Sequence, residues 1–359
     1  MSAAATPWWA WVSPSLAFAI MLVMMAVGAA GVFAGLGVAV LIAAVFASVY
    51  HAEVIAHRIG EPFGTLVLAV SVTVIEVALI VSIMFGVAAD KSGLVRDTVF
   101  AVVMIVCNGI VGLCLLSGGV RHHEQGFQLQ GASAALAVLA PLTILTLVLP
   151  NVTTSSTGPT FSTSQLIFAG VTSLVLYCSF VFVQTVRHRD YFLVPQDGNG
   201  EVHAPPPTGN VALISLGLLL LALVAIVGLA KALTPALERV ILWFGAPKAV
   251  VGIAIAMLVL LPESLAALRA ARANRLQTSL NLALGSALAS IGLTIPAVAC
   301  VAIILDQRLD LGLNMKDTVL LALTLFVGVI TLGTGRTTVL QGMVHLVIFA
   351  AFLFLSIVP

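Results

Sequence analysis

The sequence has 359 residues, of which 61% are hydrophobic and 8% are charged, and its mean hydropathy is +1.18. No soluble globular protein needs so much apolar residue, so the composition excludes that class and predicts an all-α, polytopic membrane protein surrounded by lipid. The formal net charge of +1 gives no reason to expect nucleic acid as a partner.

Apolar runs of about 20 residues, the length that crosses a hydrocarbon core of about 30 Å, follow one another along the chain. They predict eleven transmembrane helices, at residues 14–31, 34–57, 62–88, 96–118, 132–150, 163–187, 210–231, 247–271, 278–304, 316–334 and 338–357. Trp8, Trp9 and Trp11 precede the first of them and are typical of anchors at the membrane interface. The four cysteines lie in apolar runs and match no zinc or redox spacing, which indicates small core residues.

One polar, proline-rich break, Arg187–Gly209, divides the chain and is typical of a linker. Without the first helix, five helices precede this break and five follow it, and an odd number per half reverses the second half in the bilayer. We therefore expect an extra helix at 1–33, two inverted five-helix repeats at 34–187 and 210–359, and a cytoplasmic linker at 188–209. Lysines and arginines divide eight to seven between the two sides, so the orientation rests on the cluster Arg269–Arg275.

Two glutamates, Glu76 and Glu263, each stand alone deep inside an apolar segment, at matched places in the two halves. Each half first carries another glutamate, Glu53 or Glu238, which precedes a glycine by seven positions. An isolated acid in hydrocarbon costs about 2.5–3.5 kcal/mol, so such residues usually face a cavity and carry function. Two of them in a repeated pattern predict a transporter with a central cation site.

Because the predicted repeats run in opposite directions, we expect Glu76 and Glu263 to meet near the middle of the membrane. Two facing carboxylates with neighbouring neutral oxygens would bind Ca²⁺ or an alkali cation as a metal site. Without the cation they repel each other, and burial favours their protonated forms. Mutual exclusion of cation and proton at one site is the physical core of antiport. Further oxygen donors are expected from Thr73, Asn108, Ser286 and Ser290.

Structural roles remain open for each of these residues. Glu76 and Glu263 could bridge helices as polar contacts, and serine and threonine hydroxyls often bond to carbonyls of their own helix. Glu53 and Glu238 lie near predicted helix ends, where they either form a proton path or gate or are solvated. Three histidines are expected to be interfacial or packed rather than ligands: His51, His57 and His345.

Several long stretches resemble the cation/proton exchanger family of the calcium/cation antiporter superfamily, and the resemblance covers nearly the whole chain after the first helix. Glu76 and Glu263 match the signature glutamates of the two family repeats. The stretch Gly118–Phe127 is similar to the loop after the family's fourth helix, and Gly335–Gly342 is similar to its last loop. The stretch Gly285–Pro296 resembles the helix that follows the second signature.

The sequence departs from the family pattern just before each signature glutamate. The family commonly has Gly-Asn there, whereas this chain has Val72-Thr73 and Val259-Leu260. The family's histidine after the second glutamate is Ser264 here. Fewer oxygens are therefore predicted in the second half, although Pro262 could break its helix and free carbonyls.

The resemblance implies a secondary antiporter of the bacterial inner membrane that exports Ca²⁺, or Na⁺ and K⁺, in exchange for protons without a cofactor. One alternative is a monovalent Na⁺(K⁺)/H⁺ antiporter with little Ca²⁺ activity. A cation channel is a second alternative, against which stand the inverted repeat and the absence of a repeated filter-like loop. A membrane-embedded hydrolase is a third, but the sequence has no HExxH motif.

Overall fold

The structure is a computed structural model that describes residues 7–28, 31–60, 71, 73–74, 76–78, 80–81, 93–193, 207–243 and 249–358. Within these residues, nine helical stretches are long and apolar enough to cross a membrane. The chain is therefore a helical, multi-pass membrane protein, as its composition predicts. The predicted number of eleven helices is not confirmed, because most of 62–88 lies outside the described residues and 247–271 forms two short helices.

The chain forms two compact units, and each unit takes segments from both halves of the sequence. Unit 1 comprises Met1–Gly86 and Gln196–Val251, and unit 2 comprises Val87–Pro195 and Gly252–Pro359. The two units therefore do not coincide with the predicted repeats at 34–187 and 210–359. Helices of one half pack against helices of the other, so the folded units cut across the halves of the sequence.

Unit 1 contains helices α1 (Trp8–Val27), α2 (Val32–Ile59) and α8 (Gly209–Trp243), which pack against one another. Fully buried alanines on these helices permit the close approach: Ala10, Ala17, Ala44, Ala47, Ala222 and Ala225. The ring of His51 is buried and lies 2.9 Å from the carbonyl oxygen of Ala10. The three predicted interface tryptophans lie within the first turn of α1, not ahead of it, and are exposed.

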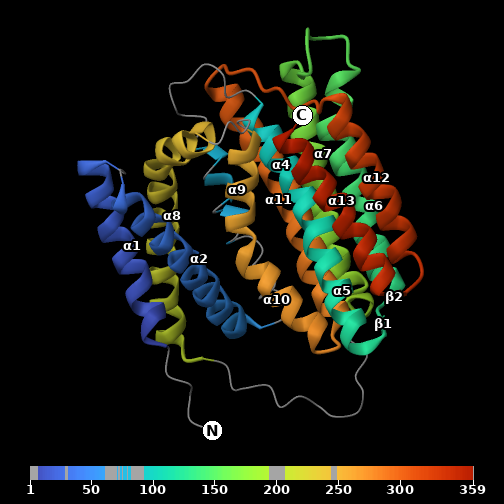
Figure 1. Cartoon of the computed structure of the whole chain (residues 1–359), viewed down its shortest axis with the longest axis horizontal. Helices are drawn as coiled ribbons and strands as arrows, with labels where there is room; N and C mark the ends of the chain where they lie inside the picture. The colour runs from blue at the N-terminus through green and yellow to red at the C-terminus, as the bar shows by residue number, and fades with distance from the viewer. Residues whose placement is uncertain are drawn as a thin grey trace. The chain divides into compact units, whose positions relative to one another are not determined.

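Unit 2 is built around one long helical stretch, Leu94–His122, which consists of α4 (Leu94–Met104), the π-helix η1 (Ile105–Ile110) and α5 (Val111–His122). The other elements are α6 (Leu129–Thr143), η2 (Ile144–Val148), η3 (Leu149–Asn151), α7 (Thr163–Phe182), η4 (Val183–Arg187), η5 (Arg189–Tyr191), α10 (Leu261–Arg272), α11 (Leu276–Ile304), α12 (Met315–Leu332) and α13 (Val339–Ile357). The short helix α9 (Ala249–Val259) precedes α10. Within the unit, α5 packs on α13, α7 packs on α11, and α6 packs on α11 and α12 (Figure 1).

Two loop contacts join the sequence halves within unit 2. Strand β1 (Glu124–Gly126), between α5 and α6, pairs antiparallel with β2 (Arg336–Thr338), between α12 and α13. An isolated bridge joins Thr160, between α6 and α7, to Asp310, between α11 and α12. The first contact joins the loop before α6 to the loop after α12, and the second joins the loop after α6 to the loop before α12. If α6 corresponds to α12, each contact is therefore the counterpart of the other with the two halves interchanged. A twofold relation between the halves would produce this exchange.

The four cysteines do not share one environment. Cys107 and Cys114 are buried in the long central stretch of unit 2, which confirms the prediction for these two. Cys178 on α7 and Cys300 on α11 are exposed, so the prediction that they are core residues is wrong. Apolar surroundings along the sequence could not separate core from lipid-facing positions, because both are apolar in a membrane protein.

Candidate functional site

Glu76 belongs to unit 1, where the described residues between 71 and 81 are helical. Its side chain is 3% exposed, and so is that of Thr73. Residues three apart lie on the same face of a helix, so Thr73 and Glu76 share one face. Val72, the other position of the predicted departure, lies outside the described residues. The buried pair Thr73 and Glu76 is therefore one part of the candidate site.

Glu263 belongs to unit 2, where a helix is interrupted next to it. Helix α9 ends at Val259, Leu260 follows, and α10 begins at Leu261 with Pro262 in its first turn. Proline has no backbone N–H, so the carbonyl of Leu258 receives no helical hydrogen bond from position 262. The interruption expected at Pro262 is therefore present, and it leaves a carbonyl oxygen without its usual donor.

The first turn of α10 is a favourable place for a negative charge. Glu263 lies in this turn and is 8% exposed, and the unpaired N–H groups at a helix start stabilise a carboxylate. The hydroxyl of Ser264 donates to the Leu260 carbonyl at 2.5 Å. The Ser264 hydroxyl therefore donates its hydrogen bond within its own chain segment, which is the structural role open to any helical serine.

Helix α11 packs against α10 and carries two predicted oxygen donors. Ser290 is 2% exposed and Ser286 is half-buried. They are four residues apart, so both lie on one face of α11. The structure therefore brings the helices of Glu263, Ser286 and Ser290 together within unit 2.

Asn108 lies in the π-helix η1 and is fully buried, and its amide is held by α12 and α13. Its Nδ2 donates to the Thr324 hydroxyl at 2.8 Å, and its Oδ1 lies 3.1 Å from Nδ1 of His345. Nε2 of His345 lies 3.1 Å from the Thr331 hydroxyl. The amide predicted to bind the cation is thus part of a buried polar network in unit 2.

The network fixes its own proton positions. A threonine hydroxyl has one proton, and that of Thr324 goes to the Leu320 carbonyl at 2.7 Å, so its oxygen accepts from Asn108. The remaining Oδ1 of Asn108 must accept, so His345 carries its proton on Nδ1. Nε2 then accepts from Thr331. Every member is satisfied with the imidazole neutral.

The sequence reasoning missed Thr324 and Thr331, and it took His345 only as packed or interfacial. His345 is indeed packed, with 1% exposure, whereas His57 is exposed. A signal for the threonines was present, because residues seven apart share one helix face. Two hydroxyls on one face of α12, within a part of the helix that is otherwise apolar from Val319 to Leu332, predict a polar partner across the interface.

The two predicted gate residues lie in helices of unit 1. Glu53 lies near the end of α2 with an exposed side chain. Glu238 lies in α8, and its side chain is outside the described part of the structure. Among the described residues, no group of three or more histidine, cysteine, aspartate or glutamate side chains is arranged to hold a metal.

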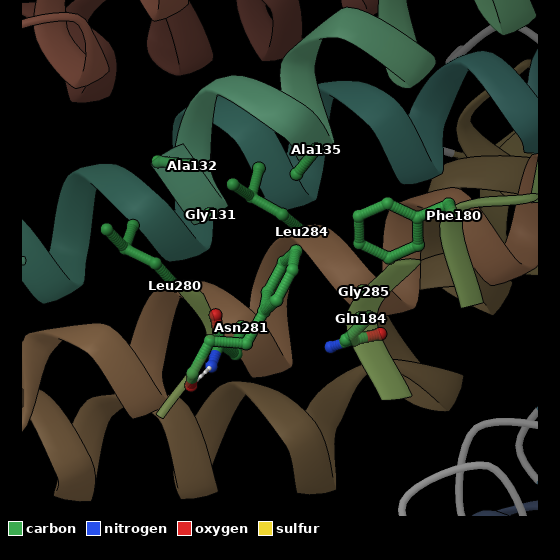
Figure 2. Close-up of a pocket in the computed structure, with 10 residues that line it drawn as sticks. Gly131, Ala132, Ala135, Phe180, Gln184, Leu280, Asn281, Leu284 and Gly285 are labelled. Carbon is green, nitrogen blue, oxygen red and sulfur yellow. Dashed lines mark hydrogen bonds between the residues drawn. The ribbon is translucent and has the colours of Figure 1, made fainter. Parts of the chain in front are cut away.

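A small hollow in unit 2 lies beside the candidate helix α11 but is a different feature. It is formed by α6, α7, η4, α11 and the start of the linker, and its volume of about 10 Å³ is room for about one water. Asn281 lines the hollow (Figure 2), and its Nδ2 donates to the Phe192 carbonyl at 2.6 Å. A Cβ added at Gly131 would clash with the Tyr191 carbonyl oxygen. The hollow thus results from close packing of the linker start against α6 and α11.

The comparison with known families decides the membership of the chain. The family model described as sodium/calcium exchanger protein matches residues 28–186 and 214–358. The chain belongs to this family. Family members are exchangers in the membrane, and the matched segments include Glu76, Asn108, Glu263, Ser286 and Ser290.

Two relatives and two solved structures are similar to the chain over most of its length. The chain is 51% identical to the y4hA protein of Sinorhizobium fredii over 98% of this chain and 97% of that protein. It is 36% identical to the sodium-potassium/proton antiporter ChaA of Escherichia coli over 87% and 85% of the two chains. Its fold is similar to native YfkE, with a TM-score of 0.73 and 18% identity over 98% and 100% of the chains. It is also similar to the H⁺/Ca²⁺ exchanger CAX, with a TM-score of 0.71 and 14% identity over 96% and 87%.

Proposed function

We propose that this exchanger is a secondary cation/proton antiporter of the bacterial inner membrane, and that Glu76 and Glu263 bind the cation and the protons in turn. The observation that carries the proposal is the burial of both carboxyl groups, with 3% and 8% exposure, in a member of an exchanger family. Burying an acidic side chain in a membrane protein costs free energy, and such residues commonly lie on the path of a transported ion.

The chemistry of exchange follows from the two states of these carboxyl groups. When ionised, each carboxylate offers oxygens to a cation. Glu76 does so beside Thr73 in unit 1, and Glu263 does so with Ser286, Ser290 and the carbonyl freed by Pro262 in unit 2. When the cation leaves, burial favours proton uptake. The helix start at α10 lowers the cost of the ionised state for Glu263. With Ca²⁺ on both carboxylates, or with both carboxyl groups protonated, no net buried charge remains. A monovalent cation reaches the same balance when one of the two carboxyl groups stays protonated.

The proposed cargo is Ca²⁺, with Na⁺ and K⁺ as further cations. The fold neighbours include a protein named as an H⁺/Ca²⁺ exchanger, but that likeness at 14% identity supports only the fold. A mainly monovalent Na⁺(K⁺)/H⁺ antiporter is favoured by the 36% identical relative, which is named a sodium-potassium/proton antiporter. Val259 and Leu260 supply no side-chain oxygen, which also favours a cation that needs fewer ligands than Ca²⁺.

The test is proton flux in proteoliposomes that contain a trapped pH-sensitive dye. Ca²⁺, Na⁺, K⁺ and choline are added separately across an imposed pH gradient. We expect proton movement that requires a transported cation and stops with choline. Cation flux that proceeds equally without any counterflow of protons would identify a channel and reject the antiport proposal.

We further propose that the linker at 188–209 is cytoplasmic and is not needed for the transport step. Asn199, in the part of the linker outside the described residues, is a suitable position for a cysteine. Cys178 and Cys300 are exposed and must first be replaced by alanine. An impermeant thiol reagent should label the new cysteine in inside-out vesicles only, and labelling from outside intact cells would reverse the proposed orientation.

A further inference from the structure

Side-chain contacts gather four chain segments at one end of unit 2. The His122 ring lies 3.0 Å from the Arg272 carbonyl oxygen, and Nε2 of Gln125 donates to the Ala271 carbonyl at 2.9 Å. Strand β1 pairs with β2, and Nε2 of Gln277 donates to the Tyr191 carbonyl at 3.5 Å. The ends of α5, η4 and α10 and the turn between α12 and α13 therefore lie together. We name this region the arginine end.

Exposed arginines concentrate in this region. Six of them are Arg121, Arg187, Arg189, Arg269, Arg272 and Arg275. A seventh, Arg336, forms an ion pair with Glu124 at 3.2 Å. Glu124 and Asp190 are the carboxylates among the described residues of this end, so its formal charge is +5.

The opposite end of unit 2 has the reverse balance. The Arg96 guanidinium donates to the Gly312 carbonyl at 3.3 Å, and the bridge from Thr160 to Asp310 marks the same end. The described residues there hold three cations and four carboxylates, a formal −1: Arg96, Arg308, Lys316, Asp97, Asp306, Asp310 and Asp317. Two of the cations are paired locally, Arg96 with Asp97 at 2.8 Å and Lys316 with Asp317 at 3.8 Å.

Helix-end electrostatics does not account for the difference. Arg121, Arg187 and Arg272 lie in the last turns of their helices, where cations are favourable. However, α11 and α13 finish at the opposite end and carry no basic residue in their last turns. Since the same helix-end effect operates at both ends, the concentration of arginines needs a reason outside the helices.

Apolar side chains beside the arginines indicate the kind of partner. Val120 is 67% exposed and precedes Arg121, and Val186 is 63% exposed and precedes Arg187. A phospholipid has both a phosphate for a guanidinium and an acyl chain for an apolar side chain. A soluble phosphate or an acidic peptide would leave the valines without a partner.

We propose that the arginine end binds anionic phospholipids, with the headgroup phosphates on the guanidinium groups and the acyl chains along Val120 and Val186. Guanidinium groups pair with phosphate oxygens in a bidentate geometry. The anionic leaflet of a bacterial membrane that faces the cytoplasm supplies such lipids, so binding also orients unit 2 with this end inside. The inference concerns a surface and does not depend on which cation is transported.

The experiment compares thermal unfolding of the full chain in detergent with added phosphatidylglycerol or phosphatidylcholine of the same acyl chains. The variant Arg121→Gln/Arg187→Gln/Arg269→Gln removes three exposed charges of the arginine end, and Arg308→Gln is the control at the opposite end. We expect phosphatidylglycerol to raise Tm by about 3 °C more than phosphatidylcholine in the wild type and the control. The triple variant should lose this difference. The triple Arg→Lys variant should keep only part of it, because lysine retains the charge but not the bidentate geometry.

Two further additions separate the sources of phosphate: glycerophosphoglycerol, which has no acyl chain, and polyglutamate. If either stabilises the wild type as much as phosphatidylglycerol does, the surface binds a soluble anion and the proposal is wrong. Equal stabilisation by both phospholipids would also reject it. These wild-type comparisons decide the question even if the triple variant does not fold, and an unchanged lipid difference in a folded triple variant rejects the assigned residues.

Discussion

Two interruptions of regular helix in unit 2, at Pro262 and at η1, differ in their cause and in the side chain that they position. At Pro262 the interruption is local, because the proline removes one donor and Glu263 takes the new helix start. At η1 no proline is present, and the six-residue π-helix holds Asn108 against Thr324 and His345. The first interruption places the Glu263 carboxylate at a helix start that stabilises its negative charge. The second holds the neutral amide of Asn108 in hydrogen bonds.

The comparison indicates different tolerances to substitution. A π-helix in the middle of a regular helix is usually retained for function. In η1, however, both polar atoms of the Asn108 side chain already form hydrogen bonds within unit 2. Asn108 is therefore expected to matter for stability first, and Glu263 for transport first. The predictions below separate these two expectations.

The largest effect is expected for Glu263→Gln, which keeps the size of the side chain and removes its charge. Cation-dependent proton flux should fall by at least about 100-fold, because the neutral amide cannot exchange a proton. Glu76→Gln should behave in the same way. Glu124→Gln is the control, since a surface ion pair is worth little and flux should persist. Near-normal flux in either buried variant would refute the proposal that both carboxyl groups carry the exchange.

His345→Phe should reduce stability by about 2 kcal/mol without abolishing flux in the folded fraction, because it leaves the buried Oδ1 of Asn108 without a donor. Unfolding in denaturing detergent measures the change. The double variant Asn108→Leu/His345→Phe removes both partners, so its loss should be smaller than the sum of the single losses. Strict additivity would show that the two side chains are not coupled.

Apparent cation affinity should rise with pH. Protons and the cation compete for the same carboxyl oxygens, so at low pH protons occupy the site, and each proton lost with rising pH frees an oxygen for the cation. Each competing proton should change the affinity by about tenfold per pH unit within its titration range. Flux titrations from pH 6 to 9 test this, and an affinity that is flat over the range would require a separate proton path.

The smallest effect is expected from Leu260→Asn, at the residue that precedes α10. Leu260 is 1% exposed and caps the helix without a side-chain hydrogen bond. Asparagine would cap α10 and supply an oxygen near Glu263. In competition, the preference for Ca²⁺ over Na⁺ should therefore rise by about threefold. Monodisperse elution in detergent checks folding, and Leu261→Asn is the control on the next position. An unchanged preference in a folded variant would place position 260 away from the cation.

Much of the fold could be predicted from the apolar runs, because the bilayer sets the length of a spanning helix. The prediction of 163–187 agrees with α7 and η4, and that of 338–357 agrees with α13 to one residue. The interruption at Pro262 was predictable since proline acts on its own helix. The exposed positions of Cys178 and Cys300 were not, because lipid and protein interiors select the same apolar residues.

The sequence by itself determined the membrane class and most of the spans, and the isolation of two glutamates in apolar segments predicted that they carry function. It also indicated the helix break at Pro262, whereas the structure showed that Glu263 lies in the first turn of the helix that follows. Only the tertiary structure decided the partners of Asn108, because Thr324 and His345 are more than 200 positions away along the chain. It likewise decided that arginines from four separate segments share one end of unit 2. Local chemistry is encoded residue by residue, whereas a network or a charged surface exists only once distant helices pack side by side.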